Sequence, residues 1–74
     1  MGKIIWITGA GSGIGKAIAQ AYNSAENIII LSGRKVSQLQ DVALNITNSF
    51  VLPLDVTNEK QIEEAVKTVE SKYS

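Results

Sequence analysis

The sequence predicts an α/β fold in which parallel strands alternate with helices. Three observations support this prediction. Short apolar runs alternate with apolar residues at helical spacing, one run is continuously apolar, and the glycines gather at a single strand-to-helix junction. Such alternation is typical of a parallel sheet whose strands are joined by right-handed helical crossovers. The predicted order across the 74 residues is β-α-β-α-β-α.

The first strand covers residues 3–8 and includes the apolar run from Ile4 to Ile7. From Ile14 to Tyr22 the apolar residues recur at helical spacing, which predicts the first helix. The second strand covers the unbroken run Ile28 to Leu31, and it ends at Ser32 and Gly33. A continuous apolar run indicates a strand that is covered on both faces, as in a parallel sheet.

Two further helices and one strand complete the pattern. Apolar residues at helical spacing from Val36 to Ile46 predict the second helix, with Ser37 and Gln40 as a possible capping box near its start. Residues 50–52 form a third short strand that stops near Pro53. Helical spacing over residues 62–69, with Tyr73 one turn further, predicts a last helix that Thr57 or Asn58 would cap.

Composition excludes several classes of function. Seven basic and seven acidic residues give a formal net charge of +0, which argues against binding to nucleic acid or to an anionic membrane. The chain contains neither Cys nor His, so we expect no disulfide and no metal site. The apolar run near the N-terminus is far too short for a signal peptide or a membrane span, and we expect a cytoplasmic protein.

The segment from Thr8 to Gly15 is the most informative part of the chain. Its glycines allow a sharp turn and let the backbone approach a ligand closely. The helix that follows points free N–H groups and the positive end of its dipole at the loop, so a pyrophosphate would fit there. A purely structural alternative is that these glycines only make a tight turn.

The spacing distinguishes between phosphate-binding motifs. A P-loop is excluded because Ala17 stands where a magnesium-binding hydroxyl is needed after Gly15-Lys16. The dinucleotide pattern G-x-G-x-x-G fails as well, because the last position falls on Ile14 or Lys16. The pattern that fits is T-G-x-x-x-G-x-G, formed by Thr8, Gly9, Gly13 and Gly15.

This loop resembles that of the short-chain dehydrogenases/reductases, which are NAD(P)-dependent oxidoreductases with one Rossmann-type domain. Ser32-Gly33-Arg34 and Leu54-Asp55-Val56-Thr57 resemble the family at the expected places, after the second and third strands. The resemblance covers the whole chain and implies a Rossmann-type βαβαβα half, with three parallel strands in the order 3-2-1 and flanking helices. Residues 1–74 would then be the N-terminal cofactor-binding part of such a domain.

The residues after the second strand favour NADP(H) over NAD(H). A Rossmann site that prefers NAD usually places a carboxylate here, to accept a hydrogen bond from the ribose 2′-OH. The segment instead reads Ser32-Gly33-Arg34-Lys35, and an arginine can bind a phosphate through two N–H groups. Both cations could simply be solvated charges at a helix start. Because a helix N-terminus disfavours cations, however, an anionic ligand explains them better.

The resemblance also implies roles for individual residues. Asp55 would accept a hydrogen bond from the adenine amino group, and the backbone of Val56 would complete the adenine contact. Thr8 would support the loop. The ribose and phosphates would contact Ser12, Gly13 and Ile14, largely through backbone N–H groups.

Catalytic residues of the family are not found in this sequence, so none is assigned. The family uses a Ser and a Tyr-x-x-x-Lys pair, whereas Tyr22 is followed four residues later by Glu26, and Tyr73 only by Ser74. We therefore expect the cofactor-binding portion of an oxidoreductase that transfers hydride between nicotinamide and a carbonyl or alcohol. The alternative is a stand-alone nucleotide-binding or assembly module without catalysis.

The first strand also predicts self-association. In the strand order 3-2-1-4 this strand would be internal, but no fourth strand is present in the sequence, so it becomes an apolar edge. The first two helices should cover one face of the sheet and the last helix the other. Because an uncharged edge can pair with another chain, we expect a homo-oligomer.

Overall fold

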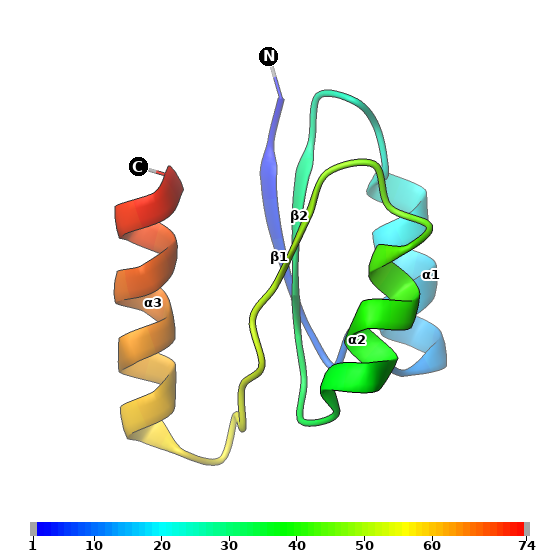
Figure 1. Cartoon of the computed structure of the whole chain (residues 1–74). Helices are drawn as coiled ribbons and strands as arrows, with labels where there is room; N and C mark the ends of the chain where they lie inside the picture. Colours follow the sequence, from blue (N-terminus) through cyan, green and yellow to red (C-terminus); the bar gives the residue numbers. More distant parts are fainter. Residues whose placement is uncertain (1, 74) are drawn as a thin grey trace.

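A computed structural model describes residues 2–73 (Figure 1). Strands and helices alternate along the whole described range, and the order β-α-β-α-β-α is confirmed. The elements are β1 (Ile4–Thr8), α1 (Gly13–Tyr22), β2 (Ile28–Ser32), α2 (Val36–Ala43), β3 (Ser49–Val51) and α3 (Glu59–Tyr73).

The three strands form one parallel sheet with β2 in the centre, which confirms the predicted order. Trp6 of β1 pairs with Ile30 of β2, and Ile30 pairs with Phe50 of β3. Helices α1 and α2 lie on one face of the sheet and α3 on the other, as expected (Figure 1). All three strands run in the same direction, so the loops that follow them meet at one end of the sheet.

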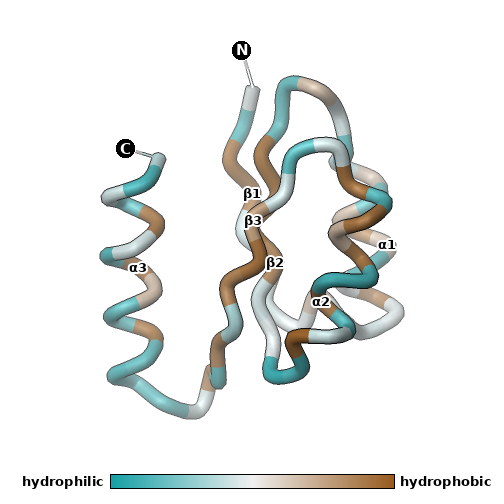
Figure 2. The backbone as a smooth tube through the Cα atoms, viewed as in Figure 1, coloured by the Kyte–Doolittle hydropathy of each residue, from teal (hydrophilic) through white to brown (hydrophobic). Residues whose placement is uncertain are grey.

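The core lies mainly between the sheet and helices α1 and α2. Ile29, Ile30 and Leu31 of β2 are fully buried, which confirms that this continuous apolar run is covered on both faces. Leu39 and Val42 of α2 pack onto it from one side. Figure 2 shows the strands as largely hydrophobic segments, and α3 as a mostly hydrophilic helix with a few hydrophobic residues. None of the helices within residues 2–73 has the length and apolarity needed to cross a bilayer.

Two details of the helices differ from the expectations. The capping box at Ser37 and Gln40 is wrong, because α2 starts at Val36 with Lys35 as its N-cap, and Ser37 therefore lies inside the first turn. The same helix ends at Ala43 rather than at Ile46. Ile46 is nevertheless buried in the core, because a turn after the helix directs it there.

The other boundaries shift by a few residues at most. Strand β3 covers residues 49–51 instead of 50–52, and α3 is longer than the apolar spacing indicated. Of the two proposed caps for α3, Asn58 is confirmed, because its Oδ1 accepts the backbone N–H of Gln61 at 3.1 Å. Thr57 instead donates to Asp55.

Within the described sheet, β1 is an edge strand with apolar side chains, and Ile4 is 46% exposed. We expect the chain to self-associate through this edge at micromolar concentration, because unpaired strand edges recruit other strands. Ile4→Lys should weaken association, since a charge on an edge opposes pairing. The matched control is Leu44→Lys, at an apolar residue that is 83% exposed and lies away from the edge. Sedimentation of a folded, strictly monomeric wild-type chain would contradict the prediction.

Candidate nucleotide-binding site

The glycine loop connects β1 to α1 through a backbone conformation that favours glycine. Gly9 has a φ of +67°, in the left-handed region, which reverses the chain directly after the strand. The carbonyl of Gly9 accepts hydrogen bonds from the hydroxyl of Ser12 at 2.8 Å and from its backbone N–H at 3.1 Å. Ala10 is fully buried and donates its N–H to the carbonyl of Ser32 at 3.0 Å. The loop is therefore attached to the end of β2.

Ser12 caps helix α1. Its Oγ accepts the N–H of Gly15 at 3.3 Å, and its carbonyl accepts the N–H of Lys16 at 2.8 Å. Within residues 2–73 no acceptor is paired with the N–H groups of Gly13 and Ile14, the first two residues of the helix. These N–H groups and the positive end of the helix dipole remain available to an anion.

Gly15 allows the helix to lie directly against the loop. A Cβ atom at this position would lie 2.3 Å from the Gly9 carbonyl oxygen and 2.8 Å from the Cα of Ala10. Real Cβ atoms essentially never approach other atoms this closely, and both neighbours are backbone atoms. Gly13 differs, because a Cβ there would have no atom within 4 Å and would point into open space.

A hollow of about 260 Å³ lies between the glycine loop and the start of α2. The predicted residues Gly9, Ser12, Arg34 and Lys35 line it, so the structure brings the loop and both cations together. Sequence reasoning missed Gln38, which also lines the hollow and lies in the first turn of α2. No sequence motif predicts that Gln38 lines the hollow, because the position of its side chain depends on how α2 packs beside the loop.

Asp55 and Arg34 lie beside a second hollow of about 670 Å³, which is also lined by Leu54 and Gln61. Arg34 Nη2 lies 3.4 Å from Asp55 Oδ1, and the two side chains are 68% and 38% exposed. Such an exposed ion pair contributes little to stability, so Arg34 can exchange this partner for another anion at small cost. Gln61 Oε1 accepts the backbone N–H of Asp55 at 3.0 Å, a contact that sequence reasoning also missed.

Thr57 stabilises the ionised form of Asp55. Its hydroxyl and its backbone N–H donate to Asp55 Oδ1 at 2.6 and 2.9 Å. These hydrogen bonds lower the pKa of Asp55, slight desolvation opposes them, and the charge of Arg34 lowers the pKa further. Because the folded-state pKa is depressed, the ionised carboxylate favours the folded state at neutral pH, and this contribution is lost as the pH falls through the folded-state pKa.

We predict that Thr57→Val raises the pKa of Asp55 toward its ordinary value, because the substitution removes the hydroxyl donor and keeps the shape of the side chain. A carbon-13 NMR titration of the Asp55 carboxyl group measures the change. Thr68→Val is the matched control, since the Thr68 hydroxyl donates to the Glu64 carbonyl inside α3. An unchanged titration of Asp55 in Thr57→Val would contradict the assigned cause.

The remaining predicted residues surround these hollows. Thr8 ends β1 in register with Ser32 of β2. Ile14, in the first turn of α1, and Val56, on the turn that follows β3, are apolar but 79% and 53% exposed. All ten predicted site residues thus lie at the carboxyl ends of the strands, in the adjoining turns or in the first turn of α1. This is the end of a doubly wound sheet at which ligands bind.

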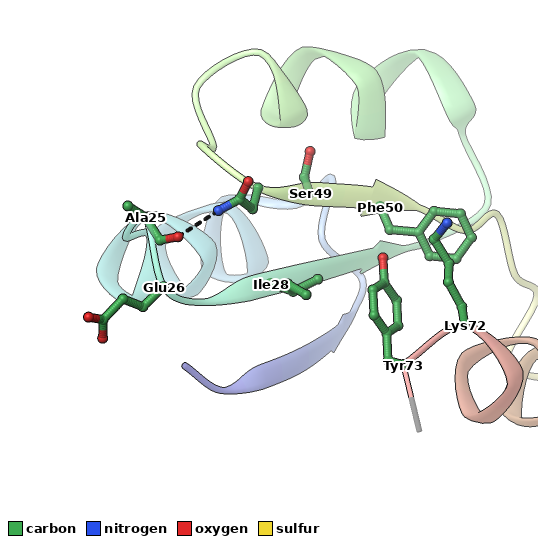
Figure 3. A pocket seen from close by; sticks show the side chains of 8 residues that line it. Ala25, Glu26, Ile28, Ser49, Phe50, Lys72 and Tyr73 are labelled. Carbon is green, nitrogen blue, oxygen red and sulfur yellow. Dashed lines mark hydrogen bonds between the residues drawn. The ribbon is translucent and has the colours of Figure 1, made fainter. Parts of the chain in front are cut away.

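A further hollow of about 500 Å³ lies at the opposite end of the sheet (Figure 3). Tyr73 packs edge-on against Phe50 with ring centroids 6.1 Å apart, and Lys72 Nζ lies 5.0 Å from the centroid of the Phe50 ring. The side chain of Asn48 donates to the Ala25 carbonyl at 2.9 Å (Figure 3). None of the predicted cofactor-binding residues lines this hollow, and Tyr73 is therefore remote from the glycine loop.

Comparisons with known proteins agree with this geometry. The sequence profile described as short chain dehydrogenase matches residues 3–74. An uncharacterized oxidoreductase of Staphylococcus aureus (strain MW2) is 38% identical over 73 residues, which span 96% of this chain and 32% of the relative. A similarly named protein of Staphylococcus haemolyticus is 37% identical over 70 residues, 92% of this chain and 30% of the relative. The chain thus spans about a third of the length of these relatives.

Two solved structures share the fold. An alcohol dehydrogenase from the archaeon Thermococcus sibiricus, complexed with 5-hydroxy-NADP, superposes with a TM-score of 0.89 at 32% identity. That match covers 99% of this chain and 33% of the dehydrogenase. L-sorbose reductase from Gluconobacter frateurii, complexed with NADPH and L-sorbose, gives a TM-score of 0.84 at 29% identity, over 97% of this chain and 29% of the reductase.

Proposed function

Because the chain belongs to the short-chain dehydrogenase family, we propose that it is the NADP(H)-binding part of an oxidoreductase. In the complete protein, bound NADP(H) would supply or accept the hydride in the interconversion of a carbonyl and an alcohol. Residues 1–74 would hold the cofactor at the N-terminal side of one Rossmann-type domain. The catalytic groups are assigned to a part of the protein beyond this chain.

One observation carries the proposal. The N–H groups at the start of α1, which have no acceptor among residues 2–73, and the cations Arg34 and Lys35 lie around the same end of the sheet. The N–H groups of Gly13 and Ile14 suit a pyrophosphate, and the open space beside Gly13 leaves room for it. The chemistry of this donor set therefore fits a dinucleotide.

The preference for NADP(H) rests on charge. In the described range, no carboxylate lines the hollow that contains Arg34 and Lys35, so the negatively charged acceptor that favours a ribose 2′-OH and repels a 2′-phosphate is not among its lining residues. The cofactors named for the two solved relatives, 5-hydroxy-NADP and NADPH, support the same choice. NAD(H) is the less favoured cofactor.

The adenine end would lie beside the ion pair of Arg34 and Asp55. The ionised Asp55 would accept from the adenine amino group, the backbone of Val56 would complete the adenine contact, and the guanidinium of Arg34 would stack on the ring. Thr8, Gly9 and Gly15 would shape the loop, and Ser12 would meet the ribose and phosphates while it caps α1. These residues bind and orient, and none of them transfers a proton.

Calorimetric titration of the chain with NADPH and NADH tests the proposal. We expect NADPH to bind at least about tenfold more tightly, because one charge-assisted hydrogen bond contributes about 1.5–3 kcal/mol. Adenosine 2′,5′-bisphosphate should bind more tightly than adenosine 5′-monophosphate for the same reason. We expect no oxidation of NADPH by the chain alone. Equal affinities for NADPH and NADH would contradict the NADP(H) preference. If none of the four ligands binds, the chain does not bind nucleotides and the proposal fails.

A further inference from the structure

Trp6 connects two strands on the face of the sheet that α3 covers. It pairs in register with Ile30, yet its indole reaches two residues further along β2, where Nε1 donates to Ser32 Oγ at 2.8 Å. Diagonal neighbours on one face of a sheet are within reach of an aromatic side chain. Ser32 is completely buried, so this hydrogen bond gives its hydroxyl a partner in a place without water.

Ser32 occupies a junction between the loops of the candidate site. Its carbonyl accepts the N–H of Ala10 in the glycine loop at 3.0 Å. The carbonyl of the next residue, Gly33, accepts the N–H of Leu54 after β3 at 2.9 Å. Arg34 follows directly and lines both hollows. The path of the backbone into Arg34 is therefore fixed by two backbone hydrogen bonds and by the side-chain bond from Trp6.

Building on the proposed function, we propose that Trp6 is a positioning residue for recognition of the cofactor's 2′-phosphate. Trp6 acts through Ser32: by fixing the end of β2, it fixes the point from which the Arg34 side chain extends toward the phosphate. A dinucleotide without the 2′-phosphate does not use this contact of Arg34. Loss of the Trp6 hydrogen bond should therefore reduce the affinity for NADPH more than the affinity for NADH.

Three variants separate this role from a merely structural one. Trp6→Phe removes the donor and Ser32→Ala the acceptor, and each single change leaves a buried or half-buried polar group without its partner. The double variant leaves neither group unpaired, so its stability should recover relative to the single variants. All three should lower the ratio of NADPH to NADH affinity about threefold to tenfold, the range for one neutral hydrogen bond. In the double variant, selectivity thus stays low while stability recovers.

Tyr73→Phe is the matched control, because it removes an aromatic hydroxyl on the same side of the sheet but at the opposite end (Figure 3). Its ratio of affinities should equal that of the wild type. The chain has a single tryptophan, so one indole N–H resonance reports the hydrogen bond. Its hydrogen exchange should be slow in the wild type and faster in Ser32→Ala.

Each outcome has a defined meaning. Reduced ratios in all three variants, with recovered stability in the double variant, would support the positioning role. A double variant that recovers both stability and the wild-type ratio would overturn it, as would indole exchange that is equal in the wild type and Ser32→Ala. If the wild type binds neither dinucleotide, the proposed function fails and this inference fails with it. Wild-type NADPH binding with unchanged ratios in all variants overturns the inference alone.

Discussion

Replacing Arg34 by Asp should weaken the binding of NADPH roughly tenfold to a hundredfold and change that of NADH far less. The guanidinium is the group placed to pair with a 2′-phosphate, and a charge-assisted hydrogen bond contributes about 1.5–3 kcal/mol. In the wild type, Asp55 Oδ1 lies 3.4 Å from Arg34 Nη2. The substitution therefore places a second carboxylate near Asp55. Two like charges there would repel the phosphate further. Calorimetric titration of both dinucleotides measures the effect.

Lys3→Asp is the matched control for this charge reversal. Lys3 is exposed and precedes β1, at the opposite end of the sheet from Arg34. The same change in net charge at Lys3 should leave the ratio of NADPH to NADH affinity unaltered. If Arg34→Asp weakens both dinucleotides equally, Arg34 does not contact the 2′-phosphate.

Gly15→Ala should both destabilise the chain and abolish tight dinucleotide binding. Its Cβ would collide with the Gly9 carbonyl oxygen and the Cα of Ala10, so the loop or the helix must move. Overpacking of this kind typically costs about 1–3 kcal/mol of unfolding free energy. The same movement displaces the N–H groups at the start of α1. Chemical denaturation and NADPH titration measure the two effects.

Gly13→Ala separates the two effects of Gly15→Ala. A Cβ at Gly13 meets no protein atom within 4 Å, so we expect the free energy of unfolding to be unchanged or slightly raised, since alanine favours helix. The methyl group would nevertheless occupy space beside the N–H groups proposed for the pyrophosphate, and NADPH affinity should fall. If Gly15→Ala kept both the free energy of unfolding and the NADPH affinity of the wild type, that result would contradict the close packing of Gly15 against the loop.

The fold could be predicted from the sequence because the apolar patterns are local and strong. The continuous, β-branched run from Ile28 to Leu31 favours a strand covered on both faces, and the structure buries it completely from Ile29 onward. Helix ends were less predictable. The start of α2 depends on where the chain leaves β2 and packs against the loop, so Lys35 rather than Ser37 precedes its first turn.

The candidate site was predictable where it depends on motifs and not where it depends on packing. Gly9 is needed for a positive φ, and Gly15 is needed for close packing of α1 against the loop. Both requirements are met by a glycine, so they can be recognised in the sequence. Gln38, Gln61 and the hydrogen bond from Trp6 to Ser32 join residues from different elements. These contacts depend on how the helices and strands pack against one another. Residue spacing along the sequence does not predict that packing.

Backbone amide NMR of the chain during addition of NADPH shows which end of the sheet holds the dinucleotide. If the carboxyl ends of the strands hold the dinucleotide, the resonances of Gly13, Ile14 and Arg34 should shift and saturate together. The resonances of Phe50 and Tyr73, at the opposite end of the sheet, should stay in place. Shifts that cluster around Phe50 and Tyr73, or no shifts with excess NADPH, would show that the carboxyl ends of the strands do not hold the dinucleotide.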